Sequence, residues 1–193
     1  MAENPAIALL EYSSVAVGTR ASDALMKKAP IRLLRAGSFQ PGRYAILFEG
    51  SVAAVEESVV EGGRVGESAL LDQVLLPDVH RGVYDAILGR RGDWGEDTVG
   101  ILETPTLSAT VRGADAAMKG AEVEMVRIRL GDGLGGKGLA YFSGVQADVE
   151  AAVEIGSGAV AEHPQPVCTT IIPRFDEGLR IHLAESTRFG EDR

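Results

Sequence analysis

The feature that most limits the fold of this chain is an internal repeat. When the 193-residue sequence is shifted by 92 positions, residues 8–35 match residues 100–127 at nine of 28 positions. Ordinary composition would give about two such matches. The matched residues include the pair Leu-Glu and the string Asp-Ala-x-Met-Lys-x-Ala. The chain is therefore predicted to contain one domain duplicated in tandem.

The register of the repeat changes only where loops are expected. The shift becomes 94 after two extra residues near 131–134, and 96 after about two more in 157–165. Both stretches are rich in Gly or contain Pro, and loops tolerate insertions better than strands or helices do. The copies join in the polar, Gly-rich segment 89–96, so the predicted domains are 1–92 and 93–193.

Each copy shows the same order of elements. Alternating apolar residues and β-branched residues predict strands, and i, i+3, i+4 spacing with abundant Ala predicts helices. The predicted order is strand, helix, two strands around a turn, helix and strand, with a short amphipathic segment after it. This βαββαβ order predicts an α+β fold made of two ferredoxin-like domains. The first copy is predicted to have strands at 6–11, 31–35, 44–49 and 74–76 and helices at 16–28 and 52–61; the second has strands at 99–103, 124–130, 139–143 and 167–172 and helices at 108–120 and 145–155.

Composition excludes several classes of function. The net charge of −9 disfavours nucleic-acid binding, which needs positive groups facing phosphates. No apolar run approaches the length of a membrane span, and the N-terminal residues do not resemble a secretory signal, so a cytoplasmic protein is expected. The single Cys168 and three scattered His residues offer no metal-ligand spacing. We therefore expect no metal, no cofactor and no membrane partner.

Several motifs together resemble a known family. They are Gly-Ile-Leu-Glu-Thr at 100–104, Ala-Asp-Ala-Ala-Met-Lys at 114–119, Gly-Leu-Gly-Gly-Lys at 133–137 and Ile-Pro-Arg at 172–174. In this combination the chain resembles bacterial microcompartment shell proteins, over about residues 6–183. It is similar to the tandem-domain, trimer-forming class in unpermuted order, and most of all to the propanediol-utilisation type.

The resemblance implies a structural role. Three chains would form a homotrimer, a pseudohexagonal tile that joins other shell proteins edge to edge and carries a central pore for small polar metabolites. The implied location is the shell of a microcompartment in the cytoplasm. The implied tile-edge residues are Lys27, Lys119 and Arg174, and the implied pore residues are Gly37, Ser38, Phe39, Gln40, Pro41, Gly131, Asp132, Gly133, Leu134 and Gly135.

Two positions depart from the family pattern. Some relatives of the propanediol type place a Cys before Pro-Gly in the first pore loop, where three thiolates hold an iron–sulfur cluster. This chain has Gln40 there, so no cluster is expected. The first copy also has Asp78 where the second copy has Arg174, which predicts unequal edges for the two domains.

Other functions remain as alternatives. A tandem ferredoxin-like sensor module could bind a small molecule between the copies or between subunits. An enzyme is not expected, because no nucleophile–base arrangement stands out. The segment 131–138 resembles a phosphate-binding loop, but it lacks the final Ser or Thr and precedes a predicted strand rather than a helix. The repeated Glu11 and Glu103 are expected to lie apart in structural roles, while Met26, Met118 and Cys168 are expected to be buried in the core.

Overall fold

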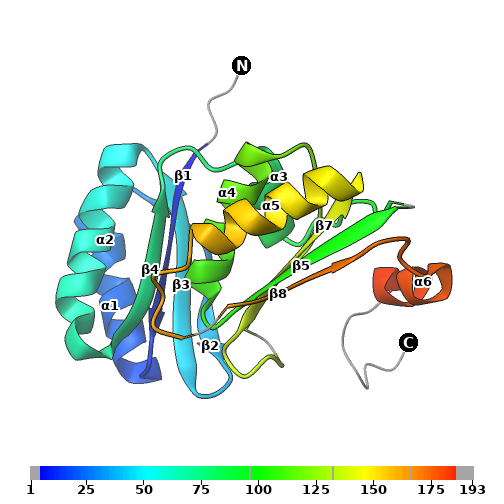
Figure 1. The fold of residues 1–193 in the computed structure, drawn as a ribbon. Helices are drawn as coiled ribbons and strands as arrows, with labels where there is room; N and C mark the ends of the chain where they lie inside the picture. Colours follow the sequence, from blue (N-terminus) through cyan, green and yellow to red (C-terminus); the bar gives the residue numbers. More distant parts are fainter. Residues whose placement is uncertain (1–4, 96, 132, 166, 186–193) are drawn as a thin grey trace.

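The computed structural model describes residues 5–95, 97–131, 133–165 and 167–185. Each half of the chain forms a four-stranded sheet, and helices cover one face of it (Figure 1). The elements of the first half are β1 (Ala6–Tyr12), α1 (Val15–Lys28), β2 (Arg32–Phe39), β3 (Arg43–Gly50), α2 (Val52–Gly66), a 3₁₀ turn (Glu67–Ala69), β4 (Leu70–Leu76) and α3 (Arg81–Ile87).

The second half repeats this order. Its elements are β5 (Thr98–Thr104), α4 (Leu107–Gly120), β6 (Glu124–Leu130), β7 (Gly138–Gly144), α5 (Gln146–Gly158), β8 (Cys168–Ile172) and α6 (Glu177–Glu185). The strand orders are β2-β3-β1-β4 and β6-β7-β5-β8, with every described pair antiparallel. The predicted α+β fold with two βαββαβ units is thereby confirmed.

Side-chain caps fix where the paired first helices begin. Ser14 precedes α1 and accepts a hydrogen bond from the Val17 amide, while Thr106 precedes α4 and accepts one from the Ala109 amide. Each hydroxyl satisfies an amide that has no partner inside the helix. The repeat therefore includes the N-terminal caps of the first helix in each domain.

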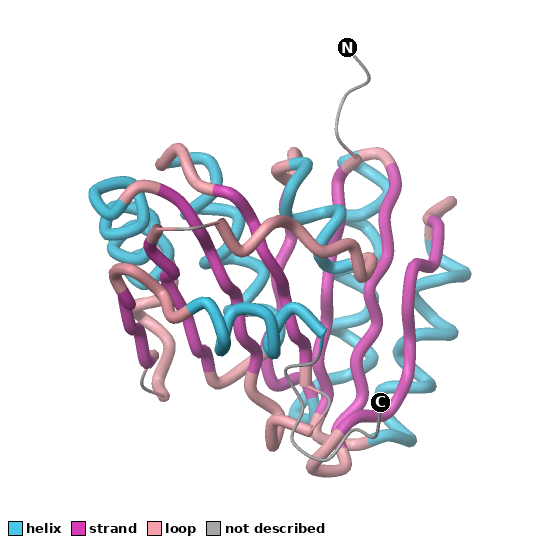
Figure 2. The backbone as a smooth tube through the Cα atoms, turned by 90° about the vertical axis from the view of Figure 1, so that its right-hand side faces the viewer, coloured by secondary structure: helices cyan, strands magenta, loops and turns pink. Residues whose placement is uncertain are grey.

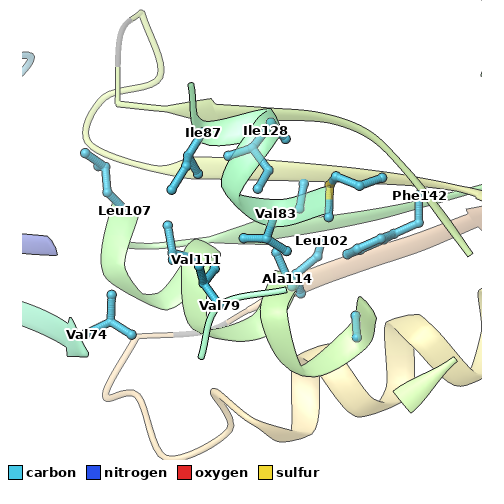
Figure 3. Packing of buried hydrophobic residues seen from close by; sticks show 14 of the residues in the cluster. Val74, Val79, Val83, Ile87, Leu102, Leu107, Val111, Ala114, Ile128 and Phe142 are labelled. Carbon is cyan, nitrogen blue, oxygen red and sulfur yellow. The ribbon is translucent and has the colours of Figure 1, made fainter. Parts of the chain in front are cut away.

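The two halves share a hydrophobic core. The largest cluster of buried side chains includes Ile7 and Leu9 from the first half and Leu107 and Val111 from the second. Helix α3 belongs to the first repeat in sequence but packs mainly on β6 and α4 of the second (Figure 1). Figure 3 shows Val83 of α3 among the apolar side chains of the second half. Burial of this shared surface fixes the relative position of the two domains.

Helix α6 occupies a different place from its counterpart α3. None of its residues is buried, and Figure 2 shows it in front of the strands, with most of the other helices behind them. Its region is tied to the inter-domain segment, because Arg91 donates to the carbonyls of Ala184 and Glu185 at 2.7 and 3.0 Å. Trp94 is buried against Phe175 and Tyr141, and these contacts hold the inter-domain segment against the second domain.

Two of the residues expected in the core lie at the surface. Met26 is 38% exposed, whereas its repeat counterpart Met118 packs partly against the shared core. Cys168 is exposed at the start of β8, which pairs with β5 alone. Both expectations were wrong for the same reason: apolar periodicity identifies a face but does not say whether the same chain covers it. Among the described residues, no helix is long and apolar enough to cross a membrane.

Candidate functional site: two adjoining loops and the domain interface

The first predicted pore loop is mostly strand. Strand β2 continues through Phe39, so Gly37, Ser38 and Phe39 pair with β3. The turn itself is Gln40–Gly42, with a cis peptide bond before Pro41 and Gly42 at φ 79°. A positive φ of this size is readily adopted by Gly alone, which explains the residue at the end of the turn.

The second predicted pore loop is a glycine-rich turn between β6 and β7. The amide of Gly131 donates to the carbonyl of Lys137 at 3.0 Å, which closes the loop at its base. Gly133 and Gly135 are exposed, and Leu134 packs partly against the cluster that contains Trp94. Asp132 lies outside the described residues. A strand follows the loop, so the helix N-terminus that a phosphate-binding loop needs is not at this position.

The two loops lie against each other. A Cβ added to Gly131 would come within 2.6 Å of the Phe39 ring, and one added to Gly136 would come within 2.6 Å of Arg43. Backbone of the second loop therefore approaches side chains of the first so closely that larger residues would clash. Sequence reasoning missed Arg43, although its position directly after the turn could have indicated a loop residue.

The predicted tile-edge lysines have different surroundings. Lys27 is exposed and forms an i, i+4 ion pair with Asp23 at 2.7 Å. Lys119 lies 2.7 Å from Asp115 and also donates to the backbone carbonyl of Asp78, in the first half. One lysine is thus held at the junction between the two domains, and the other is held only by its own helix.

The third predicted edge residue, Arg174, is exposed and adopts a left-handed backbone conformation at φ 50°. Its counterpart Asp78 lies beside Lys119 through its carbonyl group. The sequence difference between these two positions therefore falls next to Lys119, a lysine predicted to lie at the tile edge. The roles of all three edge residues stay predictions.

A buried carboxylate of the first domain accepts a hydrogen bond from the second domain. Glu11 is fully buried at the end of β1, and its Oε1 accepts a hydrogen bond of 2.6 Å from the amide of Ser108 in α4. Its Oε2 is buried without a hydrogen-bond partner. Desolvation raises the pKa of Glu11 to about 7, against the opposing effect of the bonds from α4, and the nearby charge of Asp72 adds to the rise.

The counterpart Glu103 is in a different environment. It is partly exposed, and the Nζ of Lys137 lies 2.6 Å from its Oε1. The two carboxylates therefore have separate partners and do not form an acid–base pair. Their structural roles differ: Glu11 caps a helix of the other domain, and Glu103 forms an ion pair beside the second loop.

Polar contacts extend the interface beyond Glu11. Asp72 of β4 accepts a hydrogen bond from the hydroxyl of Thr106, the residue that caps α4. Arg112 donates to the carbonyl of Gln73 at 2.7 Å, and its guanidinium lies 3.8 Å from Asp72. Within the described ranges, no group of three or more His, Cys, Asp or Glu side chains could hold a metal ion.

Sequence comparisons identify the repeated unit. A family model of the BMC domain matches the chain twice, at residues 6–79 and 98–175. The bacterial microcompartment shell protein PduT of Citrobacter freundii is 33% identical over 180 residues, which is 93% of this chain and 98% of that protein. The carboxysome assembly protein CcmO of Synechocystis is 27% identical over 186 residues, which is 89% of this chain and 61% of CcmO.

Structural comparisons agree. A microcompartment protein from Desulfitobacterium hafniense has a TM-score of 0.81 and 35% identity, covering 92% of this chain and 99% of that one. A fused permuted hexameric shell protein shares the fold at 20% identity and a TM-score of 0.59, covering 81% of this chain and 84% of its own. With two matches to the domain model and a shell protein 33% identical over nearly its full length, this chain belongs to the BMC-domain family of microcompartment shell proteins.

Proposed function

We propose that three copies of this chain close a ring of six domains, which serves as one pseudohexagonal tile in the shell of a bacterial microcompartment. The domains of the ring would be residues 1–92 and 93–193. The role is structural and not catalytic, in keeping with the shell protein that is 33% identical. The observation that carries the proposal is that the chain uses one domain interface internally and leaves both halves of a matching interface exposed.

The paired helices show this imbalance. Helix α4, which receives the first domain, buries nine of its 14 residues, whereas its counterpart α1 buries four of 14. Strand β2 has no fully buried residue, while β6, its counterpart, has three that contact the shared core and the Trp94 cluster. The surface formed by α1 and β2 therefore resembles the receiving surface on α4 and β6 before a domain is bound to it.

The helices that follow the last strand of each domain, α3 and α6, show the same difference in burial. Val83 of α3 is fully buried, and its counterpart Leu179 of α6 is 46% exposed. In the internal interface α3 packs close to Met118 and Met125, since a Cβ on Gly82 would come within 3.1 and 3.4 Å of them. Their counterparts, Met26 and Leu33, are 38% and 45% exposed. If α6 packed on α1 and β2 of the next chain, all of these apolar side chains would be covered.

An interface of this kind is heterologous, because each copy presents a donating surface and a receiving surface. Such interfaces close into rings when the rotation between copies divides a full turn. Duplication keeps six domains around the axis with only three chains. Each ring would then contain three internal interfaces and three interfaces between chains.

Within the ring, the two adjoining loops would meet at the axis and line a pore for small polar metabolites. The lining groups would be backbone groups and a few side chains from 37–41 and 131–135, which suits a narrow passage. Lys27, Lys119 and Arg174 would face neighbouring tiles of the same or other shell proteins. Changing both lysines to Asp should then abolish flat arrays and leave the ring intact.

The test combines light scattering with negative-stain microscopy. We expect a mass near three times the 20.3 kDa of one chain, and hexagonal arrays at low salt. Leu179→Asp should reduce the mass to that of one chain without unfolding it, because Leu179 is already exposed there. The matched control is Val60→Asp, which changes a 72% exposed residue whose counterpart, Glu154, is exposed outside the internal interface.

Three outcomes would contradict the ring. The wild type could remain a monomer or dimer at all concentrations, Leu179→Asp could leave the mass unchanged, or Val60→Asp could lower the mass as much as Leu179→Asp does. A trimer that never forms arrays would keep the ring and refute the edge roles of the lysines.

A further inference from the structure

A hollow of about 330 Å³ opens between the end of α3 and the edge of β6. It is lined by arginines from both domains and from the segment that joins them, together with four small or apolar residues. The arginines are Arg35 of β2, Arg90 and Arg91 after α3, and Arg127 and Arg129 of β6. None of the described lining residues carries a carboxylate.

This concentration of positive charge is unusual for the chain. Five of its 15 Arg residues line one hollow, while the protein as a whole carries a net charge of −9. Gathering like charges costs free energy, and the cost falls when an anion binds among them. The volume lies at the lower end of the range of about 300–1,000 Å³ found for small-molecule sites.

The acidic groups in the described part of the chain do not pair with every arginine of the hollow. The carboxylate of Asp85 lies beside the hollow, where it is shared between Arg90 at 3.2 Å and Arg81 at 3.0 Å. Arg91 donates to backbone carbonyls of α6, which leaves its charge uncompensated. No described carboxylate lies within ion-pair distance of Arg35, whereas Arg81, Arg90 and Arg112 each have a carboxylate partner. Arg35 and Arg91 therefore keep positive charges at the hollow that no described carboxylate neutralises.

We propose that this hollow binds a small phosphate-bearing anion. Guanidinium groups are planar forks that match two oxygens of a phosphate at once, and they stay charged at every physiological pH. Several of them around one space favour a multiply charged anion over a monocarboxylate, because each further negative charge gains additional ion pairs. The flanking residues Gly89 and Ala86 lack bulk, so oxygens of the ligand can approach the guanidiniums.

The hollow continues toward the paired loops. Arg35 and Leu130 also line an adjoining, mainly apolar hollow of about 270 Å³ that includes Ser38 and Phe39. Arg35 and Arg127 are counterparts in the repeat, so a ring of chains would set six of these arginines around its axis. A location of this hollow beside the entrance of the pore rests on the proposed function, whereas the anion-binding site itself is complete within one chain.

Isothermal titration calorimetry of the full-length protein with inorganic pyrophosphate tests the proposal. We expect saturable binding at one site per chain that weakens with added salt, and binding of acetate at least tenfold weaker. Arg35→Gln and Arg129→Gln should each weaken pyrophosphate binding by about tenfold or more, since each removes a charged hydrogen-bond donor. Arg20→Gln is the matched control, because Arg20 is an exposed arginine on α1 outside the hollow.

Absent pyrophosphate binding, equal loss in the Arg20 control, or equal affinity for acetate would each overturn the proposal. The mass of every protein is measured in the same samples. Pyrophosphate binding by a protein that forms no trimers would support this site and refute the ring. Trimers that bind no pyrophosphate would support the ring and refute this site. Circular dichroism of each variant ensures that a loss of binding is compared only between folded proteins.

Discussion

Glu11→Gln should stabilise the protein at pH 8 and change little at pH 4.5. Burial raises the pKa of Glu11 from 4.5 to about 7, so the folded chain holds a proton there that the unfolded chain has already lost. Between these two values the folded state binds more protons than the unfolded state, and its stability falls as the pH rises. Above pH 7 the side chain is ionised in both states and the loss is complete.

The magnitude follows from the size of the pKa change. A difference of one pKa unit corresponds to about 1.4 kcal/mol, so the rise from 4.5 to about 7 corresponds to about 3 kcal/mol. The N-terminus of α4 and the amide of Ser108 favour the ionised form, by up to about 2 kcal/mol for a partly buried anion at a helix end. The net rise shows that desolvation, with one oxygen lacking a partner, outweighs this benefit.

Gln tests this balance because it resembles the protonated acid and carries no charge. Its amide oxygen can still accept from the Ser108 amide. In urea unfolding at constant protein concentration, followed by Trp94 fluorescence, the advantage of Glu11→Gln over the wild type should grow by about 3 kcal/mol between pH 4.5 and 8. Taking the difference between two proteins cancels the titration of the other groups.

Glu103→Gln is the matched control at the same position of the other repeat. That substitution removes an ion pair with Lys137 on a partly exposed side chain, so it should cost up to about 1 kcal/mol and give no gain that increases with pH. An advantage of Glu11→Gln that stays constant from pH 4.5 to 8, or a variant less stable than the wild type at pH 8, would refute the reasoning.

Three further predictions test the packing and the proposed ring. Gly113→Ala should lower the free energy of unfolding by about 1–3 kcal/mol, because the new Cβ would lie 2.7 Å from Leu102. The control Gly158→Ala places its Cβ where no atom lies within 4 Å, so it should raise the free energy of unfolding by up to about 1 kcal/mol. Both values are measured by chemical denaturation, and equal effects of the two substitutions would contradict the close packing of α4. Trp94→Ala should cost about 3–5 kcal/mol in the same assay, since the ring is 6% exposed and stacked; a loss below about 1 kcal/mol would mean that the inter-domain segment contributes little. Cys168 is the repeat counterpart of Asp72, which lies in the internal interface. Its thiol should react slowly with a thiol reagent in the trimeric wild type and rapidly in the Leu179→Asp variant. Equal rates in the two proteins would contradict burial of β8 between chains.

The repeat made most of the fold predictable, and the errors have local causes. The second helix was predicted to end at 61, but it continues through Gly62 and Gly63 to Gly66. A Cβ on Gly62 would come within 2.8 Å of Leu10 and 3.0 Å of Leu25, so this Gly serves close packing inside the helix. A sequence pattern does not distinguish a Gly that ends a helix from one that lets the helix approach a sheet.

The site was predictable only in part. Its two loops could be located, since the turn residues and the family motifs mark them. The contact of Phe39 with Gly131 and the arginine hollow depend on how two domains meet across about 90 residues of sequence, which no local pattern encodes. The exposure of Met26 and Cys168 has the same origin, because periodicity predicts an apolar face and does not say whether the chain itself covers that face.

In the proposed ring, duplication would allow the internal interface and the interface between chains to differ in their electrostatics, as the surroundings of Glu11 and Glu103 illustrate. An interface inside one chain forms at a high effective concentration, so it tolerates a costly buried carboxylate such as Glu11. An interface between chains must also overcome the loss of translational freedom, and an uncompensated charge there would weaken assembly directly. Glu103 has Lys137 beside it, and the counterpart of Lys137 is Arg43, which instead lies against Gly136 in the second loop. In the first domain, Arg43 therefore contacts the second loop and leaves Glu11 without a cationic partner. This arrangement is tolerable only where the peptide chain holds the two domains together.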